Sequence, residues 1–274
     1  EIKNKEAWHG MYDPRDPDWK KKAKVVSFDL ETRKVDNKTE VIAVIVHVNG
    51  QEVDIRYNGT EDNKVAHTSE SLRGILQDLE AYQNQGYHVV THAGNNADFS
   101  WIASELETIT DAQIKTDAQN MLGRVMLRSH DMMAIVQGYS RGQMVSLENL
   151  AIAAQAGRPE GDKHLKSTQA KGEEIGRVWT EHVNNNSAES IAEMERITAY
   201  MVSDGRATTE TFIDLVQAIG TQTAIEVKFN QRNGQSVMQK IPRLPMVQTW
   251  RLALTNPERM GRLTPDKMFR DVKD

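Results

Sequence analysis

The sequence predicts an α/β domain whose mixed sheet is flanked by helices. Three stretches with strand character lie within residues 24–57. Helices and short apolar strands then alternate from residue 69 to residue 218, which is the order typical of α/β domains. The chain has 274 residues, of which 38% are hydrophobic, so it can bury a core in one large domain.

The predicted strands at the start of the domain cover 24–30, 40–48 and 52–57. The last two are joined through Asn49-Gly50, a strong signal for a hairpin turn. Residues 1–22 combine tryptophan, glycine and proline without periodicity, so we expect them to form an irregular N-terminal arm.

A helix is predicted over about 69–84, because apolar side chains recur there at helical spacing. These side chains are Leu72, Ile75, Leu76, Leu79 and Tyr82, and Gly86 is placed to end the helix. A short buried strand is expected over 87–92, followed by a loop and a helix from about Asp98. Another short strand is expected near 125–127, and a helical stretch from about Asp131.

The rest of the predicted domain is helical. Ser146 caps a helix that we expect to reach about residue 156, where Gly157 ends it. Helical potential returns near 169–183, and Ser187 opens a long helix to about residue 218. We therefore place the main domain at 23–218.

Residues 219–274 are predicted to form a C-terminal extension. Asn233-Gly234 is a turn signal that suggests a hairpin over 223–241, although its two arms show no clean apolar face. Residues 242–274 contain four prolines, and we expect them to wrap the core or to link to another module.

Composition excludes several classes of protein. The net charge of −5 argues against a protein that coats duplex DNA, so any contact with nucleic acid should be local. The absence of cysteine excludes a disulfide framework and a zinc-thiolate site. No membrane span or signal peptide is visible, so we expect an intracellular protein, cytoplasmic or nucleoid-associated. Because the chain begins with Glu1, we expect a processed product or an excised piece of something longer.

Two carboxylates follow an apolar, β-branched run. Asp29 and Glu31 stand at i and i+2, so they project from the same face of the predicted strand. Like charges on one face repel each other, and a divalent cation with a preference for carboxylate oxygens resolves that conflict. The alternative is an ordinary acidic strand end at the surface.

Two further segments carry carboxylates in defined contexts. Asp98 follows a strand and a Gly/Asn turn and stands where a helix begins, so on its own it would be a helix cap. Tyr200 and Asp204 lie at i and i+4, on one face of the long helix. On their own they would be a core-edge aromatic and a solvated acid.

Taken together, these segments resemble the DEDD superfamily of 3′–5′ exonucleases, in the subgroup whose third motif is Tyr-x-x-x-Asp. Asp29-Leu30-Glu31-Thr32 resembles the first motif, Asp98 in its strand–turn–helix setting the second, and Tyr200 to Asp204 the third. Two landmarks of polymerase I-type proofreading domains have counterparts in His130-Asp131 and in the Ser-Leu-x-x-Leu-Ala segment that begins at Ser146. The resemblance covers about residues 24–218 and implies a ribonuclease H-like fold.

The resemblance also implies the site residues and the mechanism. It implies a catalytic set of Asp29, Glu31, Asp98, Tyr200 and Asp204. The four acids among these would hold two divalent cations, Mg²⁺ or Mn²⁺, and Tyr200 would orient the attacking water. The substrate strand would be contacted by Leu30, Thr32, Asn95, Asn96 and Trp101.

The second motif departs from the family pattern at two positions. Gly94 stands where an asparagine is usual, and Ala97 stands where an aromatic residue is usual. Ala199 occupies the position at which the other subgroup carries histidine, which favours the tyrosine variant. His92 and His130 are not in that register, so we interpret both as structural or loop histidines.

Three functions are therefore open at the level of sequence. The first is hydrolysis of single-stranded DNA or frayed 3′ ends to nucleoside 5′-monophosphates, as in proofreading, with a DNA polymerase in the same or another chain as a candidate partner. The second is the same reaction on RNA, as in ribonuclease D-like relatives, and we favour DNA. The third is a non-catalytic nucleic-acid-binding module on a nuclease fold.

Overall fold

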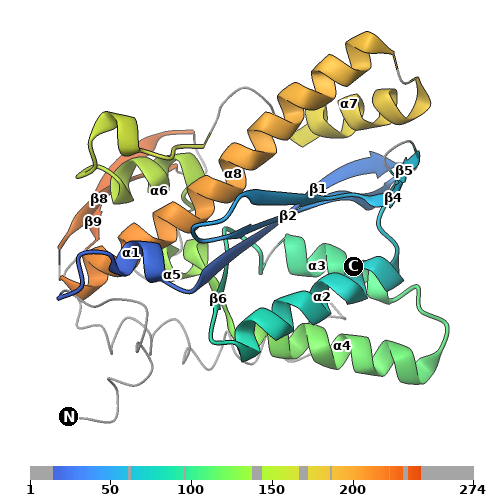
Figure 1. The fold of residues 1–274 in the computed structure, drawn as a ribbon, viewed down its shortest axis with the longest axis horizontal. Coiled ribbons are helices and arrows are strands. Elements are labelled where there is room, and N and C mark those ends of the chain that lie inside the picture. The colour runs from blue at the N-terminus through green and yellow to red at the C-terminus, as the bar shows by residue number, and fades with distance from the viewer. Residues whose placement is uncertain are drawn as a thin grey trace.

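A five-stranded mixed sheet lies at the centre of the molecule, with strand order β3-β2-β1-β6-β7 (Figure 1). The computed structural model describes residues 15–60, 63–95, 97–137, 144–166, 172–185, 187–221, 223–230 and 234–241. The strands of the sheet are β1 (Val25–Val35), β2 (Lys38–Val48), β3 (Val53–Arg56), β6 (His88–Thr91) and β7 (Ser129–Asp131). The pairs β1–β2 and β2–β3 are antiparallel, whereas β1–β6 and β6–β7 are parallel. The predicted α/β class with a mixed sheet is confirmed.

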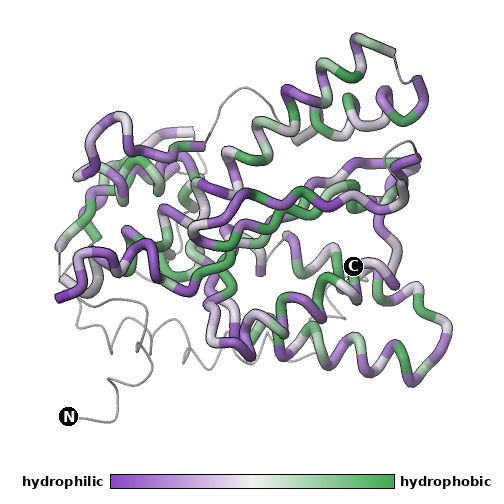
Figure 2. Tube along the Cα trace, in the orientation of Figure 1, coloured by the Kyte–Doolittle hydropathy of each residue, from purple (hydrophilic) through white to green (hydrophobic). Residues whose placement is uncertain are grey.

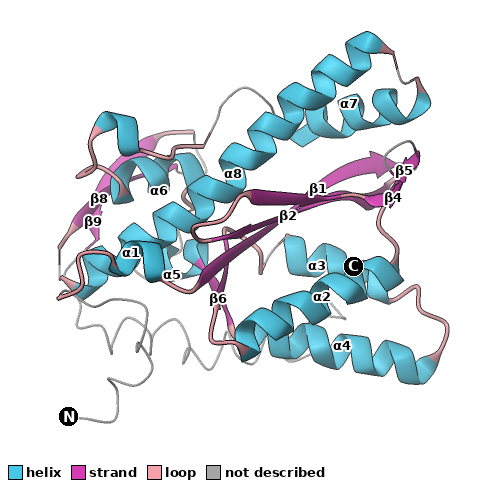
Figure 3. Cartoon of the chain, in the orientation of Figure 1, coloured by secondary structure: helices cyan, strands magenta, loops and turns pink. Residues whose placement is uncertain are grey.

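Helices cover both faces of this sheet (Figure 3). One face packs against α2 (Ser69–Asn84), α3 (Asp98–Leu106) and α4 (Ala112–Leu127), around buried residues such as Phe28 and Phe99. The opposite face packs against α7 (Gly172–Asn184) and the long α8 (Ala188–Gly220), around residues such as Ile45 and Trp179. The hydropathy colouring in Figure 2 shows the apolar stretches of β1 and β2 lying between these two layers.

A third buried cluster lies beside the sheet, where the second half of α8 meets smaller elements. These elements are α1 (Trp19–Lys22), α5 (Met132–Gln137), α6 (Leu147–Ala154), β8 (Ile225–Asn230) and β9 (Ser236–Ile241). The remaining elements are the short strands β4 (Asn58–Thr60) and β5 (Asn63–Val65) and the 3₁₀ turn η2 (Glu160–Asp162).

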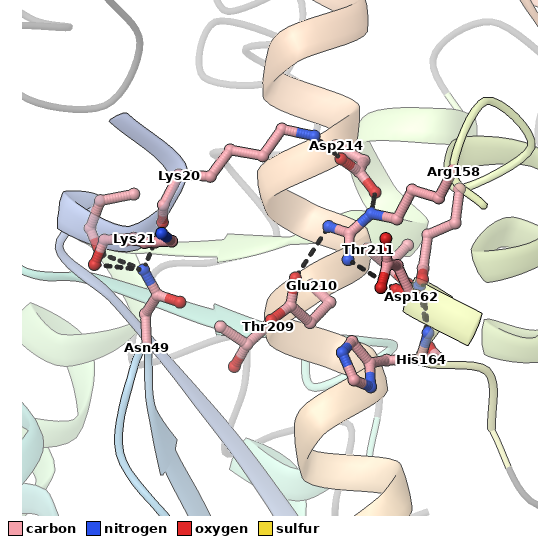
Figure 4. Close-up of polar contacts among 12 residues, drawn as sticks. Lys20, Lys21, Asn49, Arg158, Asp162, His164, Thr209, Glu210, Thr211 and Asp214 are labelled. Atoms are coloured by element: carbon pink, nitrogen blue, oxygen red, sulfur yellow. Dashed lines mark hydrogen bonds and ion pairs between the residues drawn. The ribbon is translucent and has the colours of Figure 1, made fainter. Parts of the chain in front are cut away.

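A polar network fixes α8 to this third cluster (Figure 4). Asp214 accepts Lys20 Nζ at 2.5 Å, and its other oxygen lies 2.6 Å from Arg158 Nε. Arg158 Nη2 also lies 2.7 Å from Glu210 Oε2. Because Asp214 is buried, these two cations balance a charge that would otherwise be costly. The network holds the helix that carries Asp204.

Most of the predicted elements are confirmed. The helix over 69–84 has the predicted bounds, and Thr68 caps it through the Ser71 backbone N–H. Ser146 accepts the Asn149 N–H and so caps α6 as predicted. The first strand is longer than predicted, because β1 continues to Val35 by pairing its polar half with β2.

The strand predicted near 125–127 is wrong. These residues form the last turn of α4, which begins after the cap residue Asp111. Ala118, Leu122 and Val125 are buried at helical spacing, so the segment belongs to an amphipathic helix rather than to a strand. The strand lies four residues later, at Ser129–Asp131.

The predicted hairpin over 223–241 is confirmed, and it has the apolar face that the sequence did not reveal. Ile225, Val227 and Phe229 are buried and alternate with exposed polar residues along β8. They join the cluster that also contains residues of α6 and α8. The predicted domain boundary at residue 218 therefore divides residues that share one hydrophobic core. Residues 1–14 of the expected arm and the tail 242–274 lie outside the described residues.

Even α8, with its 33 residues, lacks the apolar character of a membrane span, and the same holds for the other helices of the described ranges.

Candidate metal and active site

Three carboxylates converge between the sheet and α8. Asp29 and Glu31 of β1 and Asp204 of α8 each offer an oxygen, and these oxygens all lie within 4.8 Å of one another. Glu31 and Asp204 are buried, and Asp29 is half-buried. These three residues are called the acid cluster below.

Strand alternation accounts for the two carboxylates on β1. Asp29 and Glu31 point to the face that α7 and α8 cover, and the residue between them points to the opposite face. That residue, Leu30, is 4% exposed and belongs to the core on the side of α2, α3 and α4. The predicted contact of its side chain with a substrate base is therefore not supported, because the side chain is part of the core.

A close approach of α8 to the sheet brings Asp204 to the cluster. A Cβ atom on Gly205 would lie 2.8 Å from Ile45 Cγ2 and 3.1 Å from Val53 Cγ1, so only glycine fits there without a shift. Ser27 Oγ donates a hydrogen bond to the Gly205 carbonyl at 2.9 Å. These contacts fix the turn of α8 that carries Asp204 against β1.

The environment of the acid cluster disfavours charge on the carboxylates. Burial and the neighbouring Asp204 raise the pKa of Asp29 to about 7. Burial, together with Asp29 and Asp204, raises the pKa of Glu31 well above its usual value. The Oδ1 atom of Asp204 is buried without a hydrogen-bond partner. Hard oxygen ligands with this excess of negative charge suit Mg²⁺ or Mn²⁺, so the residues fit the predicted metal chemistry.

Asp98 lies behind the acid cluster rather than within it. It is 2% exposed, its Oδ1 accepts the Leu30 backbone N–H at 3.2 Å, and its carboxyl group lies next to that of Asp29. Burial and the nearby Asp29 raise the pKa of Asp98 well above its usual value. Asp29 is therefore in contact with Asp98 and with the acid cluster, which brings all four predicted acids together.

The turn before Asp98 is held by a buried carboxylate that the sequence did not single out as functional. Asp131 accepts the backbone N–H groups of Ala93 at 2.9 Å and Asn95 at 3.2 Å, and also that of Met133 at 2.9 Å. Ala93 has a positive φ of 66°. A Cβ on Gly94 would lie 2.4 Å from Thr91 Oγ1, so a larger residue such as asparagine does not fit this turn without a shift.

Tyr200 lies one helical turn before Asp204 and is 6% exposed. Burial and the adjacent Asp204 raise the pKa of Tyr200 to about 12, so its hydroxyl remains protonated at neutral pH. Its ring belongs to the core on the α7–α8 side, and its hydroxyl oxygen accepts a hydrogen bond from the Lys166 ammonium. The structure thus combines a packed ring with a hydroxyl at the site.

Lys166 is the site residue that the sequence analysis missed. Its Nζ lies 2.5 Å from Asp204 Oδ2 and 5.3 Å from the centre of the Tyr200 ring. Burial lowers the pKa of Lys166, but Asp204 and Tyr200 outweigh that effect and raise it. The segment that carries Lys166 has no periodic pattern, so no local signal connects it with Asp204.

The other residues that were predicted to contact the substrate lie in different surroundings. Thr32 is half-buried and lines a groove beside the acid cluster. Trp101 packs against the core on the α2–α4 side, and Asn95 is half-buried in the turn held by Asp131. Asn96 lies outside the described residues.

Both histidines near these motifs have structural partners. His92 Nε2 lies 3.0 Å from the Val145 carbonyl. His130 Nε2 lies 3.0 Å from His88 Nδ1, and its ring stacks on Phe212. The interpretation of His92 and His130 as structural residues agrees with these contacts.

Comparisons with family models, with curated proteins and with solved structures give no match to this chain. The function must therefore be argued from the geometry of the site.

Proposed function

We propose that this chain is a metal-dependent 3′–5′ exonuclease that hydrolyses single-stranded DNA or frayed 3′ ends to nucleoside 5′-monophosphates. The observation that carries the proposal is the convergence of Asp29, Glu31 and Asp204 within 4.8 Å, from a strand and a helix far apart in the sequence. Asp98 and Tyr200 lie close to this cluster and supply the fourth acid and the hydroxyl that the proposed reaction requires.

The fit of the residues to divalent cations supports this chemistry. Two such ions, when bound, activate a water and stabilise the charge that develops on a phosphodiester during hydrolysis. Asp29, Glu31, Asp204 and Asp98 would hold them, because together they supply oxygen ligands and an unsatisfied buried oxygen on Asp204. Burying several carboxylates together is costly, because each disfavours charge on the others. Such a set with raised pKa values therefore favours a functional site over a purely structural role.

The protein groups at the site have separate tasks in this proposal. Tyr200 keeps its proton at neutral pH, so its hydroxyl can hold and orient the attacking water. Lys166 provides a fixed positive charge beside Asp204 that can face a phosphate oxygen. The buried packing around both residues limits their motion, which favours a pre-organised site.

Two alternatives share parts of this evidence. A ribonuclease D-like enzyme would use the same acids on RNA, and the described site contains no group that selects the sugar. A non-catalytic binding module would be expected to lack one of the acids, whereas this chain has all four.

The test is to incubate the protein with 5′-labelled single strands of DNA and RNA, in Mn²⁺ and in EDTA. We expect progressive shortening from the 3′ end, release of nucleoside 5′-monophosphates, and no reaction in EDTA. The relative rates on the two strands decide between DNA and RNA. Degradation of a closed circular single strand at the same rate would overturn the assignment as an exonuclease.

A further inference from the structure

A groove of about 630 Å³ opens beside the acid cluster, between β1 and α7. It is lined by residues 32–34 of β1 and by Gly176, Arg177, Thr180 and Glu181 of α7, and it is called the Arg33 groove below. Its volume lies within the range of ligand-binding sites. The two elements approach closely at its base, since a Cβ on Gly176 would lie 2.9 Å from Arg33 Cβ.

The Arg33 groove lies next to the acid cluster along β1, because its lining begins at Thr32, the residue after Glu31. Arg33 follows Glu31 by two residues, about 7 Å further along the strand. Its guanidinium lies over the Trp179 ring of α7, so it faces the helical layer that also covers Glu31. The neighbouring strand β6 pairs with β1 only from Val25 to Ser27. Within the described residues, no strand covers that edge of β1 beside the groove. A ligand at the acid cluster can therefore extend into the groove.

The guanidinium of Arg33 is held in place inside the groove. Its Nε donates to Glu40 Oε2 at 2.9 Å, its Nη1 donates to Thr180 Oγ1 at 3.1 Å, and it lies 4.5 Å from the centre of the Trp179 ring. The Arg33 side chain remains 22% exposed. A guanidinium fixed in this way retains free N–H groups and loses little entropy when it binds an anion.

Two exposed cations flank Arg33. Lys34 is exposed and has no ion pair among the described residues. Among the residues that the structure describes, Arg177 pairs with Glu181 at 3.1 Å, and both side chains are about 60% exposed, so that pair is weak. The lining thus contains three cations and one carboxylate, and Glu40 beside it pairs with Arg33 at 2.8 Å, so Lys34 carries the positive charge that no described ion pair balances.

We infer that the Arg33 groove binds the phosphodiester backbone of the single strand whose 3′ end lies at the acid cluster. This inference rests on the proposed function and adds the path of the substrate. Arg33 would hold one phosphate in a fixed position, and Lys34 and Arg177 would attract the backbone through charge. The sugar and base are not selected by this contact, so DNA and RNA strands should both use it.

The test compares affinities without turnover. Single strands of DNA and of RNA, each about eight nucleotides long, are titrated by fluorescence anisotropy against Asp29→Ala and against Asp29→Ala with Lys34→Ala and Arg177→Ala. We expect the added substitutions to weaken binding about tenfold at low salt. The slope of log K against log salt should become shallower by about 1.4, since each phosphate contact on a single strand contributes about 0.7.

A matched control separates the groove from a general effect of net charge. Arg124 and Lys228 are exposed cations on α4 and β8, and replacing both by alanine changes the net charge by the same amount. This control should keep the affinity and the salt slope. A dinucleotide used as competitor, too short to reach from the acid cluster along the groove, should bind the groove variant and its parent equally.

The outcomes distinguish the inference from the proposed function. Equal losses in the groove variant and in the control, or an unchanged salt slope in the groove variant, would overturn the groove as the strand path while leaving the nuclease assignment intact. If the wild-type protein hydrolyses no strand but the groove variant alone loses affinity, the proposed function fails and the binding surface stands.

Discussion

Lys166 Nζ lies 2.5 Å from Asp204 Oδ2, so a lysine from an irregular loop neutralises the carboxylate that α8 brings to the acid cluster. The Asp204 side chain is 3% exposed and the Lys166 side chain 30%. Asp204 is therefore the buried partner of this ion pair. Because its second oxygen has no hydrogen-bond partner, one side of Asp204 is compensated and the other faces the acid cluster.

Removing this counter-charge should destabilise the metal-free protein. We expect Lys166→Gln to lower the free energy of unfolding in EDTA by about 1–3 kcal/mol, a range reduced for the partial exposure of the lysine. Added Mn²⁺ should raise the melting temperature more in the variant than in the wild type, because a cation then replaces the lost charge. The control is Lys163→Gln, which removes an ion pair with the exposed Glu160 and should change neither melt. Identical melts of Lys166→Gln and wild type in EDTA would contradict the role of the pair.

The acid cluster should lower the stability of the metal-free protein and should be required for hydrolysis. Asp29→Ala removes the carboxylate that contacts both Asp98 and the other acids, so hydrolysis should be lost. The melting temperature in EDTA should stay the same or rise, because repulsion and burial of charge are relieved. Asp117→Ala, on the exposed side of α4, serves as the matched control and should keep full activity. Full activity of Asp29→Ala would remove it from the catalytic set.

The hydroxyl of Tyr200 should matter for the rate rather than for affinity. Tyr200→Phe keeps the buried ring and loses the hydroxyl, so single-turnover hydrolysis should fall by about 10²–10³. The KM should change little, because the contact would act mainly in the transition state. Tyr82→Phe, at the edge of the core on the other face of the sheet, should have no effect on the rate. Equal single-turnover rates of the wild type and Tyr200→Phe would show that the Tyr200 hydroxyl has no part in catalysis.

The close approach of α8 at Gly205 can be tested against a glycine with open surroundings. Gly205→Ala should destabilise the protein by about 1–3 kcal/mol, because the added methyl group forces α8 away from Ile45 and Val53. Activity should fall as well, since Asp204 moves with the helix. Gly74 in α2 has no atom within 4 Å of the added Cβ, so Gly74→Ala should be neutral or stabilise by up to about 1 kcal/mol. Denaturant unfolding of the two variants checks both values, and equal effects would show that the approach is not tight.

Stability should fall in acid because of the half-buried pair of His88 and His130. Burial and the neighbouring His88 lower the pKa of His130 from 6.5 to about 3. Between these values the unfolded chain binds a proton that the folded protein does not, so this contribution falls as pH drops below about 6.5, by up to about 1.4 kcal/mol per pH unit. His130→Phe keeps a ring beside Phe212 and removes this titration. Urea unfolding between pH 7 and pH 5 should show a shallower pH dependence in the variant, and parallel curves would contradict the assignment.

The sequence by itself determined the orientation of the functional side chains within their own elements. The period of two in β1 places Asp29 and Glu31 on one face, and the helical period places Tyr200 and Asp204 together on α8. The same local patterns gave the bounds of α2 and the cap of α6. Their catalytic roles remain a prediction.

Only the tertiary structure decided which of these faces meet. The approach of α8 at Gly205 brings Asp204 to β1, and a loop without periodicity delivers Lys166. Packing also placed Leu30 in the core and gave β8 its buried face. The physical reason is that periodicity reports each residue's direction relative to its own helix or strand. Convergence depends instead on long-range packing between elements, which no local pattern in the sequence encodes.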